Sequence, residues 1–127
     1  LNILVRGIAR VELGRELAPE RPYREIHASL ASELPARAGT EVETMRRAVL
    51  QLSESLEPEL AQLLGMAAAR LADPGMLCDV VAAAVLVDPQ ALQDVLEALD
   101  VDLRLQRVLG EIGTLLLDSR PPDTLLQ

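Results

Sequence analysis

Lysine is absent from this chain, and aromatic residues, histidine and cysteine each occur once, as Tyr23, His27 and Cys78. Without lysine the chain can have no P-loop lysine, no Schiff-base lysine and no Ser-Lys dyad. One histidine and one cysteine exclude a two-histidine metal motif, a structural zinc site and a disulfide framework. We therefore expect neither a metal nor an organic cofactor.

Long apolar runs and net positive charge are missing as well. No stretch approaches the roughly 20 apolar residues of a membrane span, and the net charge of −8 repels nucleic-acid phosphates. We expect no membrane and no nucleic acid among the partners, and a cytoplasmic protein, with which a single cysteine is compatible. The chain opens on Leu1 instead of methionine, which predicts a fragment or a processed piece.

The residues that are abundant favour helices. The chain of 127 residues contains 26 leucines and 17 alanines, which is the composition of a helical protein and argues against an all-β sandwich. Charge is unevenly spread, because residues 1–38 carry a net charge of +1 and residues 39–127 a net charge of −9. The hydrophobic period changes at the same place. We therefore predict a β-rich part over residues 1–38 and a helical bundle over residues 39–127.

The first part has the alternation typical of strands. Apolar or small residues fall on every second position from Ile3 to Leu13, which predicts a half-buried strand over residues 3–13. Glycine and prolines break the pattern over residues 14–22, and alternation returns over residues 26–30 as a second strand. Two strands alone are marginal in water. We expect this sheet to lean on helices, on another copy of the chain or on a missing part.

The second part carries helix-start signals at regular intervals. Thr40 with Glu43 forms a capping box, and later helices begin with an acid at the N-cap. These later starts are Glu57-Pro58, Asp73-Pro74, Asp88-Pro89 and Asp100, and Pro121-Pro122 ends the last helix. The apolar residues that follow each start recur with helical spacing. The fold predicted is α+β, a short hairpin followed by a bundle of about five helices.

The sequence contains no catalytic constellation. His27 lies on the polar row of its strand, where we expect it to face solvent, and Cys78 is expected to be a buried, inert thiol. Asp100 to Glu111 echoes a calcium loop only faintly, because the loop's glycine is replaced by Leu105. We expect Gly110 and Gly113 to let helices approach closely. The three methionines, Met45, Met66 and Met76, are expected to fill the core.

Three blocks of the sequence resemble a known family, the N-terminal domain of ATP-dependent Lon proteases. Residues 73–83, DPGMLCDVVAA, are similar to that family's DPxxLADxIAA signature, and residues 96–105, LEALDVDLRL, to its LLExxDVxxRLExL. Upstream, residues 2–11, NILVRGIARV, resemble its xVLVEGxxRxRI strand, and residues 23–34 would form the strand that follows. The blocks occur in the family's order and spacing, and they cover most of the chain.

The resemblance implies a non-catalytic domain that recognises unfolded or damaged proteins. In that family a PUA-like β subdomain precedes a helical bundle, and an ATPase and a Ser-Lys peptidase follow, so this chain would begin partway through the β subdomain. Two positions depart from the family pattern. Cys78 stands where alanine is common, and Pro121-Pro122 interrupts a helix that tends to continue. From these departures we expect the parent to be a divergent Lon or a stand-alone Lon-domain protein with no protease attached.

The candidate protein-binding residues are Leu4, Arg6, Ile8 and Arg10, which share one row of the first predicted strand. They could offer apolar surface to exposed segments of unfolded substrates. Alternatively, strands outside this chain could bury them. A competing function is self-association, for which we predict a dimer formed through residues 1–34, with the helical part on the outside.

Overall fold

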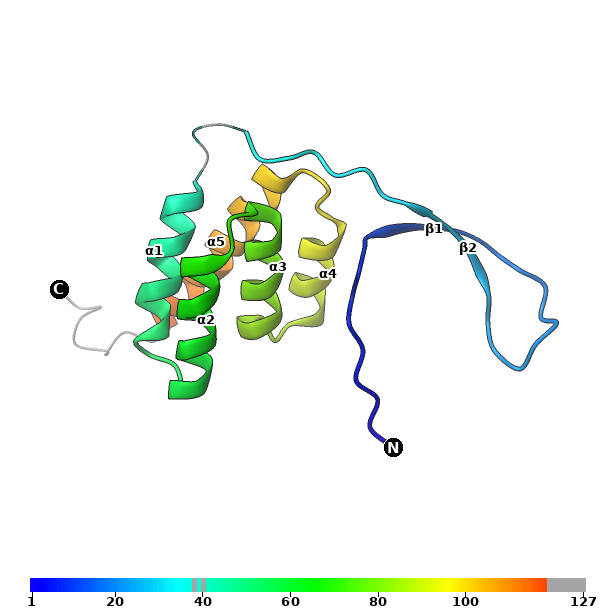
Figure 1. Ribbon diagram of the computed structural model, residues 1–127, viewed down its shortest axis with the longest axis horizontal. Helices are drawn as coiled ribbons and strands as arrows, with labels where there is room; N and C mark the ends of the chain where they lie inside the picture. Colours follow the sequence, from blue (N-terminus) through cyan, green and yellow to red (C-terminus); the bar gives the residue numbers. More distant parts are fainter. Residues whose placement is uncertain (38, 40, 119–127) are drawn as a thin grey trace. The chain divides into compact units, whose positions relative to one another are not determined.

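The structure, a computed structural model, describes residues 1–37, 39 and 41–118 (Figure 1). Two strands precede five helices, which confirms the predicted α+β class. The elements are β1 (Val11–Glu16), β2 (Ile26–Leu30), α1 (Val42–Ser53), α2 (Pro58–Arg70), α3 (Pro74–Val85), α4 (Pro89–Glu97) and α5 (Val101–Asp118). The chain divides into two compact units, a β unit, Leu1–Glu33, and a helical unit, Leu34–Gln127. As domain limits, 1–38 and 39–127 remain a prediction.

The β unit is an antiparallel hairpin. Val11 pairs with Leu30 and Glu16 with Ile26, and the register shifts between Leu13 and Glu16. The second strand lies where it was predicted, over residues 26–30, but the first strand was placed wrongly over residues 3–13. Alternation continues through residues 1–10, yet a strand needs a partner and β2 has only five residues. Residues 1–10 therefore stay outside the two strands, although the Arg10 carbonyl accepts from the Ala31 N–H beside them.

Acidic caps begin three helices of the helical unit as predicted. The carboxylates of Asp73 and Asp88 accept from the backbone N–H two residues later, and Asp100 accepts in the same way from the N–H of Asp102. Glu57 precedes α2 but makes no capping hydrogen bond through its side chain. The predicted box at Thr40 and the stop at Pro121-Pro122 fall outside the described residues.

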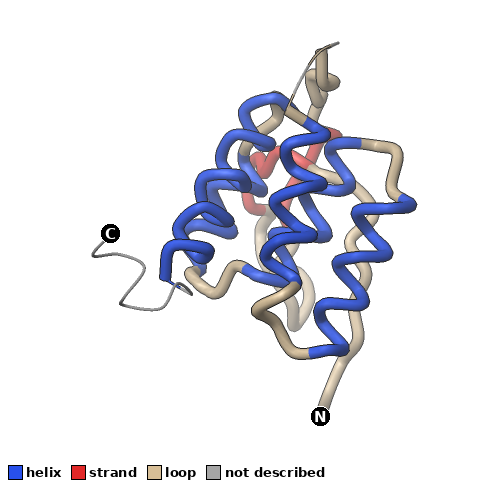
Figure 2. The backbone as a smooth tube through the Cα atoms, turned by 90° about the vertical axis from the view of Figure 1, so that its left-hand side faces the viewer, coloured by secondary structure: helices blue, strands red, loops and turns tan. Residues whose placement is uncertain are grey.

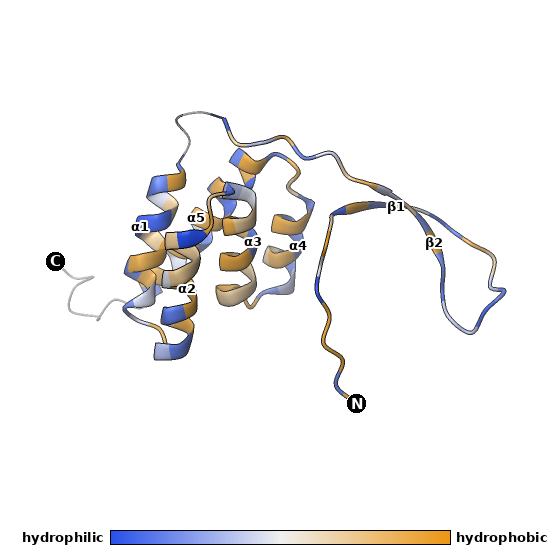
Figure 3. Cartoon of the chain, viewed as in Figure 1, coloured by the Kyte–Doolittle hydropathy of each residue, from blue (hydrophilic) through white to orange (hydrophobic). Residues whose placement is uncertain are grey.

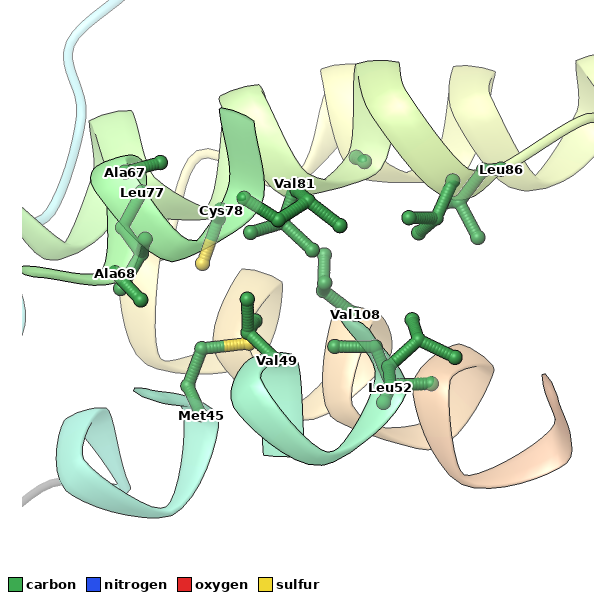
Figure 4. Packing of buried hydrophobic residues seen from close by; sticks show 14 of the residues in the cluster. Met45, Val49, Leu52, Ala67, Ala68, Leu77, Cys78, Val81, Leu86 and Val108 are labelled. Atoms are coloured by element: carbon green, nitrogen blue, oxygen red, sulfur yellow. The ribbon is translucent and has the colours of Figure 1, made fainter. Parts of the chain in front are cut away.

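The core lies within the helical unit, whose helices pack side by side (Figure 2). Its buried side chains come from all five helices, and Figure 4 shows Met45 and Val49 of α1 facing Cys78 and Val81 of α3. Cys78 is buried, as expected, and Met45 fills the core. Met66 and Met76 were expected there too, but both are exposed, because each lies on the outer side of its helix.

Arginine side chains tie the helices together at their C-terminal ends. Arg46 of α1 donates to the carbonyl oxygens of Ala68 and Leu71 at the end of α2, the latter at 2.7 Å. Arg107 of α5 donates to the carbonyl oxygen of Asp94 in α4 at 2.6 Å. The last carbonyls of a helix lack intrahelical partners, so these guanidinium groups satisfy acceptors that would otherwise need water.

Arg104 forms the most deeply buried of these ties, with only 1% of the residue exposed. Its Nε and Nη2 atoms donate to the carbonyl oxygen of Ala98, which follows α4, at 3.0 and 2.8 Å. Its Nη1 atom lies 3.5 Å from the Asp79 carboxylate of α3. One guanidinium group therefore joins α5 to the end of α4 and to the middle of α3.

Three helical glycines are expected to be sites of stabilisation, and for two of them, Gly110 and Gly113, the predicted role in close packing was wrong. A Cβ atom added at Gly65, Gly110 or Gly113 would meet nothing within 4 Å. Replacing each by alanine should raise the free energy of unfolding by about 0.5–1 kcal/mol, because alanine loses less backbone entropy on folding. Thermal unfolding followed by circular dichroism should show the melting temperature rising with each replacement.

Gly75 is the matched control for these glycine replacements. An added Cβ atom there would lie 3.1 Å from Nη1 of Arg104 and 3.5 Å from Cγ2 of Val101. Gly75→Ala should therefore fail to stabilise the helical unit. If Gly75→Ala raised the melting temperature as much as Gly110→Ala, the packing described around Arg104 would be wrong.

Candidate protein-binding surface

The four candidate residues do not share one environment. Leu4 and Ile8 are 99% and 93% exposed, and Arg6 is exposed beside them in the segment that precedes β1. Arg10 differs, because only 14% of its side chain is accessible and its guanidinium group pairs with Glu33 at 3.1 Å. In the β unit, then, Leu4, Arg6 and Ile8 are available for contact, while Arg10 holds the base of the hairpin.

Exposed apolar side chains extend beyond the predicted candidates. Figure 3 shows hydrophobic residues along much of the segment before β1 and into the strand. The large exposed apolar residues of the β unit are Leu1, Ile3, Leu4, Val5, Ile8, Val11, Leu13, Tyr23, Ile26 and Leu30. The alternation that predicted the second strand already contained the signal for Ile26 and Leu30, although neither was named as a contact residue. Apolar residues gathered on one small unit are typical of a surface that contacts another molecule.

The charges of the hairpin are largely paired with one another. Arg24 forms two hydrogen bonds to the Glu16 carboxylate, at 2.6 and 3.0 Å. This guanidinium group lowers the pKa of Glu16, and the carboxylate raises the pKa of Arg24. Because the pKa of Glu16 is lowered in the folded state, the pair stabilises the hairpin at pH values above the pKa that Glu16 has in the unfolded chain. That contribution disappears as the pH falls through the lowered pKa.

A shallow hollow lies in the loop that joins the two strands. It is lined by Glu16, Leu17, Ala18, Pro19, Arg21, Pro22, Tyr23 and Arg24. The Arg21 guanidinium group lies 5.8 Å from the centre of the Tyr23 ring and donates to the Tyr23 hydroxyl at 2.6 Å. Arg21 and Tyr23 therefore bind each other in this loop.

A second hollow, in the helical unit, is held by ion pairs. Arg37 lies 3.0 Å from the carboxylates of both Asp100 and Asp102, and Leu34 forms a parallel bridge with Asp100. The amide N–H of Leu34 donates to the Leu99 carbonyl at 2.9 Å, and the amide of Val101 donates to the Leu34 carbonyl at 3.0 Å. These contacts attach residues 34–37 to the start of α5, so we assign them a structural role.

Residues 1–37, 39 and 41–118 contain no group of three or more His, Cys, Asp or Glu side chains that could hold a metal ion. Within the same ranges, every helix is too short or too polar to cross a bilayer. His27 is exposed on β2, as expected from its place on the polar row.

Comparison with known proteins agrees with the three sequence blocks. Residues 1–113 match the family model of the ATP-dependent protease La (LON) substrate-binding domain. The chain is 38% identical over 113 residues to a Lon protease of Roseiflexus castenholzii, covering 87% of this chain and 14% of that protein. Lon proteases of Dictyoglomus thermophilum and Desulforamulus reducens are 31% and 27% identical, over 85% and 89% of this chain.

The match covers a small part of each of these proteases. The chain spans 14% of the length of each of these relatives. Over that share it carries the hairpin and the helical unit described above, with the DPGMLCDVVAA block in α3 and the LEALDVDLRL block running from α4 into α5. The chain therefore belongs to the family of LON substrate-binding domains.

Proposed function

We propose that this chain recognises unfolded or damaged proteins for a Lon-type, ATP-dependent protease and takes no part in catalysis itself. The observation that carries the proposal is the concentration of exposed apolar side chains in the β unit. The same unit has five arginines and five glutamates, so its formal net charge is zero. A neutral, apolar surface can accept many different unfolded segments, because none is repelled by charge.

Leu4 and Ile8 are proposed as contact residues, with Arg6 between them. An apolar side chain gains about 1.5–3 kcal/mol on full burial, so two such side chains suffice for a measurable share of the affinity. Arg6 adds a guanidinium group that can donate to the backbone carbonyls of an extended segment. Arg10 is proposed to act indirectly, by holding the hairpin through Glu33.

The test is binding of the whole chain to fluorescently labelled casein, an unfolded protein, followed by anisotropy. Leu4→Ser combined with Ile8→Ser should weaken binding at least tenfold, because both side chains lose apolar contact area. Leu63→Ser is the control, since Leu63 is also exposed but lies on α2. Unchanged affinity in the double variant would show that Leu4 and Ile8 do not contact the bound protein. Absence of casein binding by the unaltered chain would overturn the recognition function.

Self-association is the second candidate function, favoured by the two open edges of the hairpin. Among the residues that the structure describes, the sheet consists of β1 and β2, so each of these strands has one edge to which no other described strand is paired. Unpaired edges invite pairing with another chain. The dimer through residues 1–34 is proposed on this ground. From the family we also propose that the protein is cytoplasmic. We propose that its parent is either a full Lon protease or a stand-alone Lon-domain protein.

A further inference from the structure

The two edges of the hairpin differ in how well they resist pairing. β1 carries Glu12, Arg15 and Glu16, and its register shifts between Leu13 and Glu16. Charged residues and bulges are the features by which edge strands avoid contact with other strands. β2 reads Ile-His-Ala-Ser-Leu, with no acidic residue, arginine, proline or glycine. Of the two, β2 is the edge that is open to a further strand.

The hydrogen-bond pattern shows which groups this edge offers. The amide of Ala31 donates to the Arg10 carbonyl at 3.0 Å, and paired residues of an antiparallel ladder alternate between bonded and non-bonded pairs. Since Ala28 faces Leu13 and Leu30 faces Val11 in the non-bonded positions, their N–H and C=O groups point away from β1. Ile26, next to the bonded pair of Leu17 and Glu25, is placed in the same way.

The sequence of β2 is complementary to itself. When two copies run antiparallel about a two-fold axis at Ala28, Ile26 of each copy faces Leu30 of the other, and His27 faces Ser29. The outward groups of residues 26, 28 and 30 then fall on the bonded positions of the new ladder. Apolar residues meet apolar residues, small residues meet at the axis, and no like charges are opposed.

We infer that a second copy of this chain pairs with the β2 edge, giving a four-stranded sheet in the order β1, β2, β2 and β1. The inference makes the self-association candidate specific and rests on it. Residues opposite each other share a face, so Val11, Leu13, Ile26 and Leu30 of both copies line one side of the combined sheet. Three or more strands with one hydrophobic face form a stable sheet where a lone hairpin is marginal.

Oxidative crosslinking tests the register directly. In the inferred dimer the two Ala28 Cα atoms lie about 5.5 Å apart, within the range that a disulfide spans. Ala28→Cys should become a covalent dimer on mild oxidation. Leu13→Cys is the matched control, because three strand spacings separate the two copies of that residue by about 14 Å. The native Cys78 is buried in both variants.

Sedimentation of the whole chain tests two statements separately: that the chain forms a dimer, and that the dimer forms through the β2 edge. Ala28→Pro removes an outward donor and should raise the dimer dissociation constant at least tenfold. Val11→Pro removes a donor from the β1 edge, which is outside the new ladder, and should raise the constant far less than Ala28→Pro, with helical circular dichroism intact in both. If the dimer were unaffected by Ala28→Pro and were not crosslinked at residue 28, pairing through the β2 edge would be wrong while self-association would stand. A monomeric unaltered chain at every concentration would overturn both the edge and self-association.

Discussion

Replacing Arg104 by methionine is expected to lower the free energy of unfolding of the helical unit by about 2–4 kcal/mol. The methionine side chain fills much of the space of the arginine stem but offers no donor. The Ala98 carbonyl would then lose its two hydrogen bonds in a buried place, where an unsatisfied group costs about 1–3 kcal/mol. The rest comes from Asp79, whose carboxylate would lose a nearby guanidinium group.

Urea unfolding followed by helical circular dichroism measures the Arg104 effect. Arg107→Met is the matched control, because Arg107 lies one turn further along α5 and donates to the Asp94 carbonyl at an exposed position. Water can replace that donor, so the loss should stay below about 1 kcal/mol. Arg104→Lys should recover only part of the stability, since an ammonium group lacks the planar fork that reaches Ala98 and Asp79 together. Equal losses in the free energy of unfolding for Arg104→Met and Arg107→Met would contradict the burial of the Arg104 hydrogen bonds.

Replacing Leu64 by alanine is the second change with a large expected effect. Leu64 is completely buried, and truncation of a buried leucine costs about 2–5 kcal/mol through lost apolar contact and the cavity that remains. Leu63 precedes it on α2 and is 52% exposed, so Leu63→Ala should cost well under 1 kcal/mol. Both variants have the same helix propensity, and the difference between their urea midpoints reports burial alone. Similar midpoints would show that α2 faces the core differently.

The helices could be predicted because their signals are local. An aspartate followed by proline fixes a helix start through a hydrogen bond two residues away and a backbone angle, so neither depends on the rest of the fold. Asp73 and Asp88 therefore cap as expected. Glu57 does not, because its side chain is longer by one carbon and is less suited to the short capping geometry.

The first strand could not be placed from its own residues. Alternation over residues 3–13 indicates which positions share a face. Which of these residues form ladder hydrogen bonds depends on the length and register of the partner strand. β2 supplies five residues, and Val11 is the first residue of β1. The predicted contact residues Leu4 and Ile8 consequently lie outside any strand.

The roles of the arginines were missed for a related reason. Arg46, Arg104 and Arg107 act on helices other than their own, at separations of 6 to 25 residues. One signal was present in the sequence. Arg104 stands three residues after Val101 and four before Val108, on the apolar side of α5, where a charged residue requires buried partners.

The arginine contacts between the helices have a consequence for each helix taken by itself. The donors that satisfy the last carbonyl oxygens of α2 come from α1, and the donors at the end of α4 come from α5. A peptide that covered α2 or α4 alone would leave these carbonyl oxygens to water, and isolated helices of this length are marginal in water. The C-terminal ends of α2 and α4 are therefore completed only when the neighbouring helix has folded against them.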